Sequence, residues 1–431
     1  MIGAAVIMIL ICLSAGGYFV LKEVQSQKTE KEGQKQENKS ADKQVKKAED
    51  KQEGNNKKDA EETEKGEDKA EEDKVELTEE EKRELEIDEI LANMPLEDKV
   101  SQLFFVRPEA LTGVEVAVQA SEVTKAALES YPVGGIVLFS ENIENEEQLR
   151  TMLSNLDSYS KYPLFLGVDE EGGTLVARVA NSGTIQVPTF PDMQEIGNTL
   201  QPEKAYEVGE TIGGYLKDLG FNLDFAPVAD VATNPDNPVI GVRSFGSDAD
   251  LVAQMVKQEV AGLQGQNISA VLKHFPGHGD TSQDSHEEAA ILNKTEEQLK
   301  ATEFLPFQAG IEGGVDLVMA GHISVPAITG DNTPACLSEK MITGCLRGEL
   351  GYDGIVITDS MRMGAIVNYY DPGQAAVMVL QAGGDMILMP QDFQKARQAV
   401  LDAVNSQTLT EDRLDESLRR IYRKKLLRRQ Q

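Results

Sequence analysis

The stretch KHFPGHGDTSQDSH, residues 273–286, contains three of the four histidines in this 431-residue chain. Imidazole side chains bind metal ions or transfer protons near neutral pH. Asp284 and His286 lie two residues apart, so the carboxylate can fix the imidazole tautomer and leave the other ring nitrogen for proton transfer. Gly277 and Gly279 allow the segment to move over a bound substrate. This stretch therefore predicts general acid–base chemistry.

A zinc site is the alternative interpretation of the same stretch. His274 and His278 are four residues apart, and Asp280, Asp284 and His286 add candidate ligands. The intervening Pro-Gly pair prevents the two histidines from sharing one helical turn, and the sequence has no HExxH motif or cysteine cluster. We therefore favour proton transfer and expect neither a metal nor a cofactor.

The elements that must position these residues begin at about residue 88. Short apolar runs alternate with amphipathic helical stretches, which is typical of parallel strands joined by crossover helices. The strand candidates are residues 105–107 and the runs GGIVLFS, PLFLGVD, FNLDFAPVAD, SAVLKHFPG, DLVMAGHI, GIVITDS and DMILMP. Eight such units predict an α/β protein with a single (β/α)8 barrel of the TIM type. A doubly wound sheet is less favoured, because no Gly-rich phosphate turn follows the first strand.

Polar residues follow several of these predicted strands, where the active sites of such barrels lie. One carboxylate at a strand end is commonly a helix N-cap, but convergence of several polar strand ends on one mouth indicates an enzyme site. A carboxylate facing a proton donor is the arrangement that cleaves glycosidic bonds. The strand-end residues are Asp169, Asp230 with Arg243 in the loop after it, Lys273, His274, His322 and Asp359.

Four motifs, KHFPGHGDTSQDSH, NPVIGVRSFGSD, DEEGG and ITDSMRMGAI, together resemble glycoside hydrolase family 3 in its β-N-acetylhexosaminidase branch. The resemblance covers about residues 88–431. It implies a (β/α)8 barrel that acts as a retaining, exo-acting β-N-acetylglucosaminidase on cell-wall muropeptides or chito-oligosaccharides. β-Glucosidase-type or phosphorolytic relatives are the alternatives, followed by a metal-dependent hydrolase. β-Glucosidase-type relatives usually take their acid/base carboxylate from a domain after the barrel. Here the eighth predicted unit extends to the last residues, which favours the N-acetylhexosaminidase branch.

The same resemblance implies a role for each matching residue. Asp359 would be the nucleophile that forms a covalent glycosyl-enzyme, and His286 would be the general acid/base with Asp284 as its partner. The sugar would be bound by Asp169, Arg178, Arg243, Lys273 and His274. Two departures from the family pattern affect these assignments. The run GGTLVAR is one residue longer than usual before Arg178, and Ser360 follows the nucleophile where some relatives have an aspartate.

The residues before the barrel differ sharply in composition from it. Residues 2–21 are uncharged and strongly apolar, and as a helix they would span roughly 30 Å, the thickness of a bilayer core. We therefore expect residues 1–21 to be a membrane anchor, or else a cleaved signal segment. Residues 22–87 are rich in Lys, Glu and Gln and predict a disordered linker. Residues 88–431 would then form the catalytic barrel on the extracellular face of the membrane, or a secreted enzyme.

Charge and cysteine content narrow the partners further. The net charge of −31 argues against nucleic acid, because phosphates require a basic surface. The expected partners are a GlcNAc-containing carbohydrate and, through the N-terminal segment, a membrane. Three cysteines do not form a disulfide framework. We expect Cys336 and Cys345 to be two separate buried thiols.

Overall fold

A computed structural model describes residues 77–429. The predicted anchor or signal segment, residues 1–21, and most of the predicted linker lie outside these residues. Among the residues that are described, no helix is both long enough and apolar enough to cross a bilayer.

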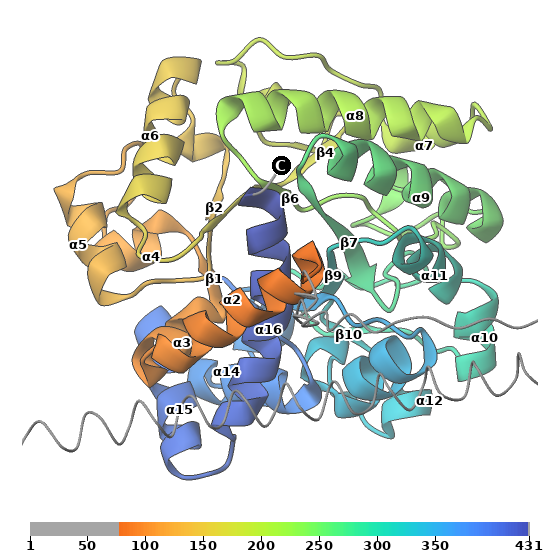
Figure 1. The fold of residues 1–431 in the computed structure, drawn as a ribbon. Coiled ribbons are helices and arrows are strands. Elements are labelled where there is room, and N and C mark those ends of the chain that lie inside the picture. The colour runs from red at the N-terminus through yellow and green to blue at the C-terminus, as the bar shows by residue number, and fades with distance from the viewer. Residues whose placement is uncertain (1–76, 430–431) are drawn as a thin grey trace, which may run out of the picture. The chain divides into compact units, whose positions relative to one another are not determined.

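Eight parallel strands form the centre of the fold (Figure 1). Their order in the sheet is β11-β9-β7-β6-β3-β2-β1-β12. The outer strands β11 and β12 are joined by a parallel bridge between Ile357 and Met386, which nearly closes the ring. The eight strands are β1 (Phe104–Val106), β2 (Gly135–Leu138), β3 (Phe165–Val168), β6 (Leu223–Asp224), β7 (Ser269–Phe275), β9 (Leu317–Ala320), β11 (Ile355–Thr358) and β12 (Ile387–Leu388). The α/β class and the eightfold alternation predicted from the sequence are thereby confirmed, in the arrangement of a TIM-type barrel.

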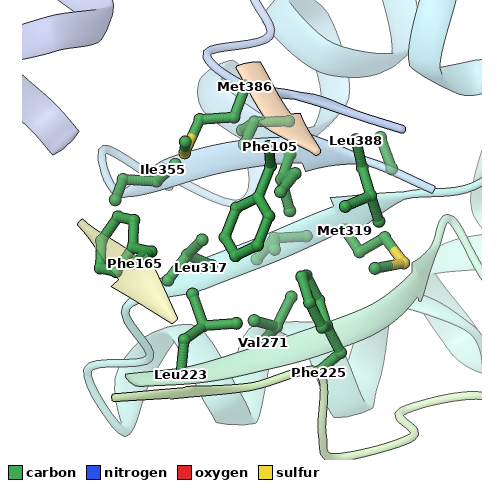
Figure 2. Packing of buried hydrophobic residues seen from close by; sticks show 14 of the residues in the cluster. Phe105, Phe165, Leu223, Phe225, Val271, Leu317, Met319, Ile355, Met386 and Leu388 are labelled. Atoms are coloured by element: carbon green, nitrogen blue, oxygen red, sulfur yellow. The ribbon is translucent and has the colours of Figure 1, made fainter. Parts of the chain in front are cut away.

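Side chains from these strands point toward one another and fill the barrel (Figure 2). Phe105 on β1 is fully buried, and its ring lies 5.3 Å from that of Phe225, centroid to centroid, in an edge-on contact. Gly135 on β2 makes room for it, because a Cβ atom there would lie 2.4 Å from the Phe105 ring. The barrel interior is therefore a packed core, and the space for a ligand must lie at its ends.

Helices connect the strands and surround them (Figure 1). The amphipathic stretches between the predicted strands correspond to helices such as α8, α10 and α11. The helices are α2 (Glu79–Asn93), α3 (Leu96–Gln102), α4 (Pro108–Thr112), α5 (Glu122–Ser130), α6 (Glu146–Tyr159), α7 (Met193–Gly197), α8 (Pro202–Leu219), α9 (Ala249–Gly265), α10 (Glu296–Ala301), α11 (Phe304–Glu312), α12 (Pro326–Thr329), the π-helix η5 (Lys340–Glu349), α13 (Gly364–Val367), α14 (Pro372–Ala382), α15 (Phe393–Asn405) and α16 (Glu411–Arg429). Two short pairs of strands lie outside the barrel: antiparallel β4 (Glu170–Gly172) with β5 (Val176–Ala177), and parallel β8 (Ala290–Ile291) with β10 (Ile323–Ser324).

The last helix, α16, crosses the end of the barrel at which the strands begin (Figure 1). Tyr422 on α16 donates a hydrogen bond to the side chain of Gln102, just before β1, at 3.0 Å. Arg428 pairs with Asp316, which immediately precedes β9. This end is therefore covered by a helix, whereas the active sites of such barrels lie at the opposite end, where the strands finish.

The first helix, α2, begins at Glu79, inside the range 22–87 predicted as a disordered linker. Its start is fixed by a capping box in which the Thr78 and Glu81 side chains bond each other's backbone N–H groups. Ile87 is buried in the hydrophobic core, and Glu84 pairs with Arg423 of α16 at 2.6 Å. The folded part thus starts before residue 88, because contacts with α16 stabilise a segment whose composition alone would not bury a core.

Candidate active site

The C-terminal ends of the barrel strands surround a cavity of about 290 Å³. Seven of the eight predicted site residues line it: Asp169, Arg178, Arg243, Lys273, His274, His286 and Asp359. The eighth, Asp284, bonds the His286 ring. Four different strands, β3, β6, β7 and β11, thus deliver the predicted residues or their loops to one place, as expected for a barrel of this type.

Two cations and two carboxylates form a buried ion-pair network on one wall of this cavity. Lys273 Nζ lies 2.8 Å from Asp169 Oδ1 and 2.6 Å from Glu171 Oε1. Arg243 binds Glu171 through both carboxylate oxygens, at 2.8 and 2.6 Å. Burial alone would raise the pKa of Glu171, but Arg243 and Lys273 lower it to about 2. Glu171 and the two cations are therefore charged near neutral pH, and the network presents fixed donors and acceptors to a ligand.

Glu171 holds this network together, although the sequence did not identify it as a site residue. It lies in the DEEGG motif, directly after the glutamate that follows Asp169. The sequence could have pointed to Glu171 through charge, because two cations at the site, Lys273 and Arg243, require a buried anion between them. Asp169 alone could not have satisfied both.

His274 is held by the carboxylate of Asp230, a residue that the sequence placed at a strand end but did not pair with any other residue. Its Nδ1 lies 2.7 Å from Asp230 Oδ2, and both groups are buried. Asp230 also accepts a hydrogen bond from the backbone N–H of His278 at 2.6 Å. Burial would raise the pKa of Asp230, but His274 and His278 lower it. The ionised Asp230 therefore fixes the proton on Nδ1 and leaves His274 Nε2 for the cavity.

His278 is fully engaged in ordering the loop that carries His286. Its Nδ1 lies 2.7 Å from Thr281 Oγ1, and its Nε2 lies 3.0 Å from Ser285 Oγ. Both ring nitrogens thus have protein partners. Within residues 77–429, no group of three or more His, Cys, Asp and Glu side chains is arranged to hold a metal ion.

Asp359 follows β11 directly and is half-buried at the centre of the cavity wall. Its Oδ1 accepts a hydrogen bond from the Ser360 N–H at 2.6 Å. Burial acts to raise the pKa of Asp359, but the facing histidines His322 and His274 and the Ser360 N–H lower it overall. The carboxylate is therefore ionised near neutral pH, as a nucleophile must be.

His322 supports the Asp359 turn from behind. Its Nε2 donates to the Ser360 carbonyl at 2.8 Å, and its Nδ1 lies 3.2 Å from Cys336 Sγ. Burial lowers the pKa of His322, which keeps the ring neutral near pH 7. Cys336 and Cys345 are both free and buried, which confirms the expectation of two separate thiols.

His286 lies on the loop after β7, and its side chain is 61% exposed. Both its Nδ1 and its backbone N–H lie 2.8 Å from Asp284 Oδ1. Burial would raise the pKa of Asp284, but these contacts with His286 lower it. Because an ionised carboxylate can only accept, Nδ1 carries the proton, and Nε2 remains free to exchange a proton with a ligand.

Arg178 reaches the same cavity despite the unusual spacing before it. The segment that carries it leaves the β4–β5 hairpin, and its N–H donates to the Asp169 carbonyl at 3.0 Å. Its Nε is buried and has no hydrogen-bond partner among the described residues. A buried guanidinium nitrogen that faces a cavity without a partner is suited to bind an oxygen of a ligand.

The buried Glu170 fixes the backbone immediately after Arg178. Its carboxylate accepts hydrogen bonds from the N–H groups of Val179 and Ala180, at 2.6 and 2.9 Å, and from the Tyr215 hydroxyl at 2.7 Å. The sequence did not identify this role, because Glu170 points away from the cavity that its neighbours Asp169 and Glu171 line.

Comparisons with known proteins agree with this geometry. A sequence profile described as "Glycosyl hydrolase family 3 N terminal domain" matches residues 95–424. The chain is 33% identical over 323 residues to Beta-hexosaminidase A of Pseudoalteromonas piscicida, covering 68% of this chain and 53% of that protein. It is 35% identical over 266 residues to a Beta-hexosaminidase of Nitrosomonas eutropha, covering 61% and 75%. A solved glycoside hydrolase family 3 beta-N-acetylglucosaminidase from Paenibacillus sp. str. FPU-7 is also similar, with a TM-score of 0.73, 38% identity, and coverage of 78% and 63%.

The chain thus spans about half the length of the Pseudoalteromonas protein and 63% of the Paenibacillus chain. The matched range nevertheless contains every residue that lines the cavity. On this basis, and in agreement with the resemblance of its motifs, the chain belongs to glycosyl hydrolase family 3.

Proposed function

We propose that the protein is a retaining, exo-acting β-N-acetylglucosaminidase that removes terminal GlcNAc from cell-wall muropeptides or chito-oligosaccharides. One observation carries this proposal: the ionised Asp359 and the Asp284-oriented His286 face the same cavity. A nucleophilic carboxylate together with a separate proton donor is what double displacement at a glycosidic bond requires. The relatives named beta-hexosaminidase support the class of activity, and the similar beta-N-acetylglucosaminidase from Paenibacillus sp. str. FPU-7 supports GlcNAc as the sugar.

In the first step, Asp359 attacks the anomeric carbon while His286 Nε2 protonates the departing glycosidic oxygen. This forms a covalent glycosyl-enzyme and releases the aglycone. In the second step, the now neutral His286 takes a proton from water, which attacks the anomeric carbon and frees Asp359. Asp284 stabilises the imidazolium that precedes the first step and reappears after the second.

The ion-pair network would hold the sugar during both steps. Asp169, Lys273 and Arg243 present charged donors and acceptors to the ring hydroxyls, and the unpartnered Arg178 Nε adds one more donor. The network is fixed by its own salt bridges before a sugar arrives, so little side-chain ordering is required on binding. A cavity of about 290 Å³ at one end of a packed barrel favours a single terminal sugar, which supports exo action.

Phosphorolysis is a second candidate, favoured by one observation. The acid/base group is an imidazole rather than a carboxylate, so it repels an incoming phosphate less. Incubating the purified protein with a chromogenic N-acetyl-β-glucosaminide, with and without phosphate, separates the two. Hydrolysis that is independent of phosphate supports the proposal, and strict phosphate dependence with formation of GlcNAc 1-phosphate contradicts it.

The same assay with EDTA should show little inhibition, and zinc-reversible loss of activity would instead support a metal-dependent hydrolase.

We also propose that residues 1–21 anchor the protein in the cell membrane, with the barrel on the extracellular face and residues beyond 21 acting as a spacer. The support is the length and apolar composition of residues 2–21 and the charged stretch that follows. Membrane fractionation of the full chain and of a variant that lacks residues 1–21 tests this. Recovery of the full-length, uncleaved chain in the soluble fraction would contradict it.

A further inference from the structure

A second hollow lies beside the active site, between the loops that follow β7, β9 and β11. It measures about 560 Å³ and is lined by Glu288, Asp331, Tyr369 and Tyr370, among others. We call it the tyrosine groove. None of the described residues that line it is a lysine or an arginine.

The groove shares a wall with the active-site cavity. The wall consists of two hydrogen-bonded segments, one from the catalytic loop and one from the segment after Asp359. The Gly364 N–H donates to the His286 carbonyl at 2.9 Å, and the Asn368 side chain donates to the Glu287 carbonyl at 3.1 Å. The position of the groove is therefore tied to the position of the proposed acid/base residue.

Along each segment, one residue lines the cavity and another, two positions later, lines the groove. His286 and Met363 line the active-site cavity, whereas Glu288 and Ala365 line the groove. Two residues span at most about 7 Å of backbone. A molecule longer than one sugar can therefore reach from the cavity across the wall into the groove.

The direction in which a substrate leaves the cavity follows from the proposed chemistry. The proton donor must lie within hydrogen-bond reach of the glycosidic oxygen, so the aglycone begins beside His286. We propose that the tyrosine groove binds the second sugar unit of the aglycone and that it selects neutral or cationic glycans over anionic aglycones. This inference rests on the proposed function and, of the two substrate classes named there, favours chito-oligosaccharides over anionic muropeptides.

The side chains of the groove match that ligand. Tyr369 is 62% exposed, which is unusual for a residue with so large a ring and leaves the ring available to the apolar C–H face of a pyranose. Because the chain has no tryptophan, stacking on a sugar must come from Tyr or Phe. Glu288 and Asp331 supply exposed carboxylates that accept hydrogen bonds from hydroxyl or ammonium groups and repel carboxylates.

The test compares substrates that do and do not reach the groove. Two substrates lack a second aglycone sugar and cannot reach the groove: an aryl N-acetyl-β-glucosaminide and N,N′-diacetylchitobiose. The second aglycone sugar of N,N′,N″-triacetylchitotriose would occupy the groove. For Tyr369→Ala, we expect the ratio of kcat/KM for the trisaccharide to that for the disaccharide to fall about tenfold, which corresponds to about 1.4 kcal/mol. Tyr369→Phe keeps the ring and should retain the ratio. Circular dichroism and the Tm of both variants verify folding.

The charge preference is tested with the trisaccharide oxidised to a carboxylate at its reducing end. The wild-type protein should cleave it more slowly than the neutral trisaccharide, and Glu288→Lys should narrow that difference.

An equal loss for the trisaccharide and the disaccharide in Tyr369→Ala, or no loss for either, would overturn the proposed groove. So would a Glu288→Lys variant with an unchanged preference. Failure of the proposed function looks different, because the wild-type protein would then not cleave the aryl substrate at all.

Discussion

The proposed role of His286 as proton donor predicts that the effect of its substitution depends on the leaving group. In His286→Ala, a natural disaccharide loses the proton that its glycosidic oxygen needs, so kcat/KM should fall by about 10²–10⁴-fold. An activated aryl group departs without much protonation, so its glycosylation step should suffer less. Steady-state kinetics on both substrates checks this. Equal, small losses for both leaving groups would show that His286 is not the proton donor.

Two neighbouring residues provide controls for that variant. Asp284→Ala should reproduce the leaving-group dependence more weakly or comparably, because the imidazole remains but loses the partner of its Nδ1. His278→Ala should act mainly through the order of the loop, since its ring bonds Thr281 and Ser285. Its losses should therefore be similar for good and poor leaving groups and should accompany a lower Tm.

The residues that line the cavity could largely be predicted from the sequence, but their buried partners could not. Strand ends converge in a barrel, so Asp169, Lys273 and Asp359 were expected together. The identity of these buried partners depends on which carboxylate side chain points into the cavity, and a shift of one residue along the chain changes that direction. Glu170 bonds backbone behind the cavity, whereas Glu171, the next residue, bridges two cations within it.

The β4–β5 hairpin provides a test at the level of an element. Glu170→Gln weakens the carboxylate contacts that hold the backbone after Arg178, and Tyr215→Phe removes one of them. We expect Glu170→Gln to raise KM for the aryl substrate roughly tenfold, with a smaller change in kcat, because hydrogen bonds to a charged group contribute about 1.5–3 kcal/mol. Tyr215→Phe should have a weaker effect in the same direction.

Combining Glu170→Gln with Arg178→Ala separates positioning from a general loss of structure. If Glu170 acts through Arg178, the double variant should bind the substrate scarcely worse than Arg178→Ala alone. Fully additive losses in KM, or a fall in Tm large enough to account for them, would contradict the positioning role.

The helix α2 leads to a different truncation boundary from the one that composition predicts. Removing residues 1–76 should leave the activity and Tm of the barrel intact. Removing residues 1–93 deletes the buried Ile87 and Leu91 and should destabilise the fold by a few kcal/mol, at about 1.5–3 kcal/mol for each buried side chain. Thermal unfolding of the two truncated proteins measures the difference. Equal Tm values would show that α2 adds no stability to the barrel.

The strands could be predicted from the sequence better than their lengths or the first helix. Each of the eight predicted runs overlaps a strand, but the strand within FNLDFAPVAD covers only Leu223–Asp224, and beyond it Val228 forms an isolated parallel bridge with Lys273. Pro227 lacks an N–H for that ladder, which is one reason the strand is short. The charged composition of residues 79–87 predicts a linker, whereas contacts with α16, far along the chain, and burial of Ile87 make them part of the fold.

For the molecule as a whole, one contribution to the pH dependence of stability should come from a buried acid outside the cavity. Glu259 on α9 is buried, and its Oε1 has no hydrogen-bond partner among the described residues. Burial raises its pKa from the ordinary 4.5 to about 8, so the folded protein holds this proton more tightly than the unfolded chain does. Its contribution to stability is therefore fully present below pH 4.5 and is lost as the pH rises through 8.

Glu259→Gln removes this titration without changing the shape of the side chain. We expect the free energy of unfolding of the variant, relative to the wild type, to increase by a few kcal/mol between pH 5 and pH 9, because one pKa unit corresponds to about 1.4 kcal/mol. Urea unfolding at the two pH values measures this change. A difference that does not vary with pH would mean that Glu259 is not neutral in the folded protein.

The proposed mechanism requires Asp359 to form a covalent bond to the sugar. His286→Ala is the variant in which to test it, since an activated aryl N-acetyl-β-glucosaminide still glycosylates the enzyme while the missing base slows deglycosylation. Mass spectrometry of the acid-quenched reaction should show the protein heavier by one N-acetylhexosaminyl group. Peptide mapping should place that group on Asp359, and Asp359→Asn in the same background should carry none. Efficient turnover by folded Asp359→Asn, or an adduct on another residue, would show that Asp359 is not the nucleophile.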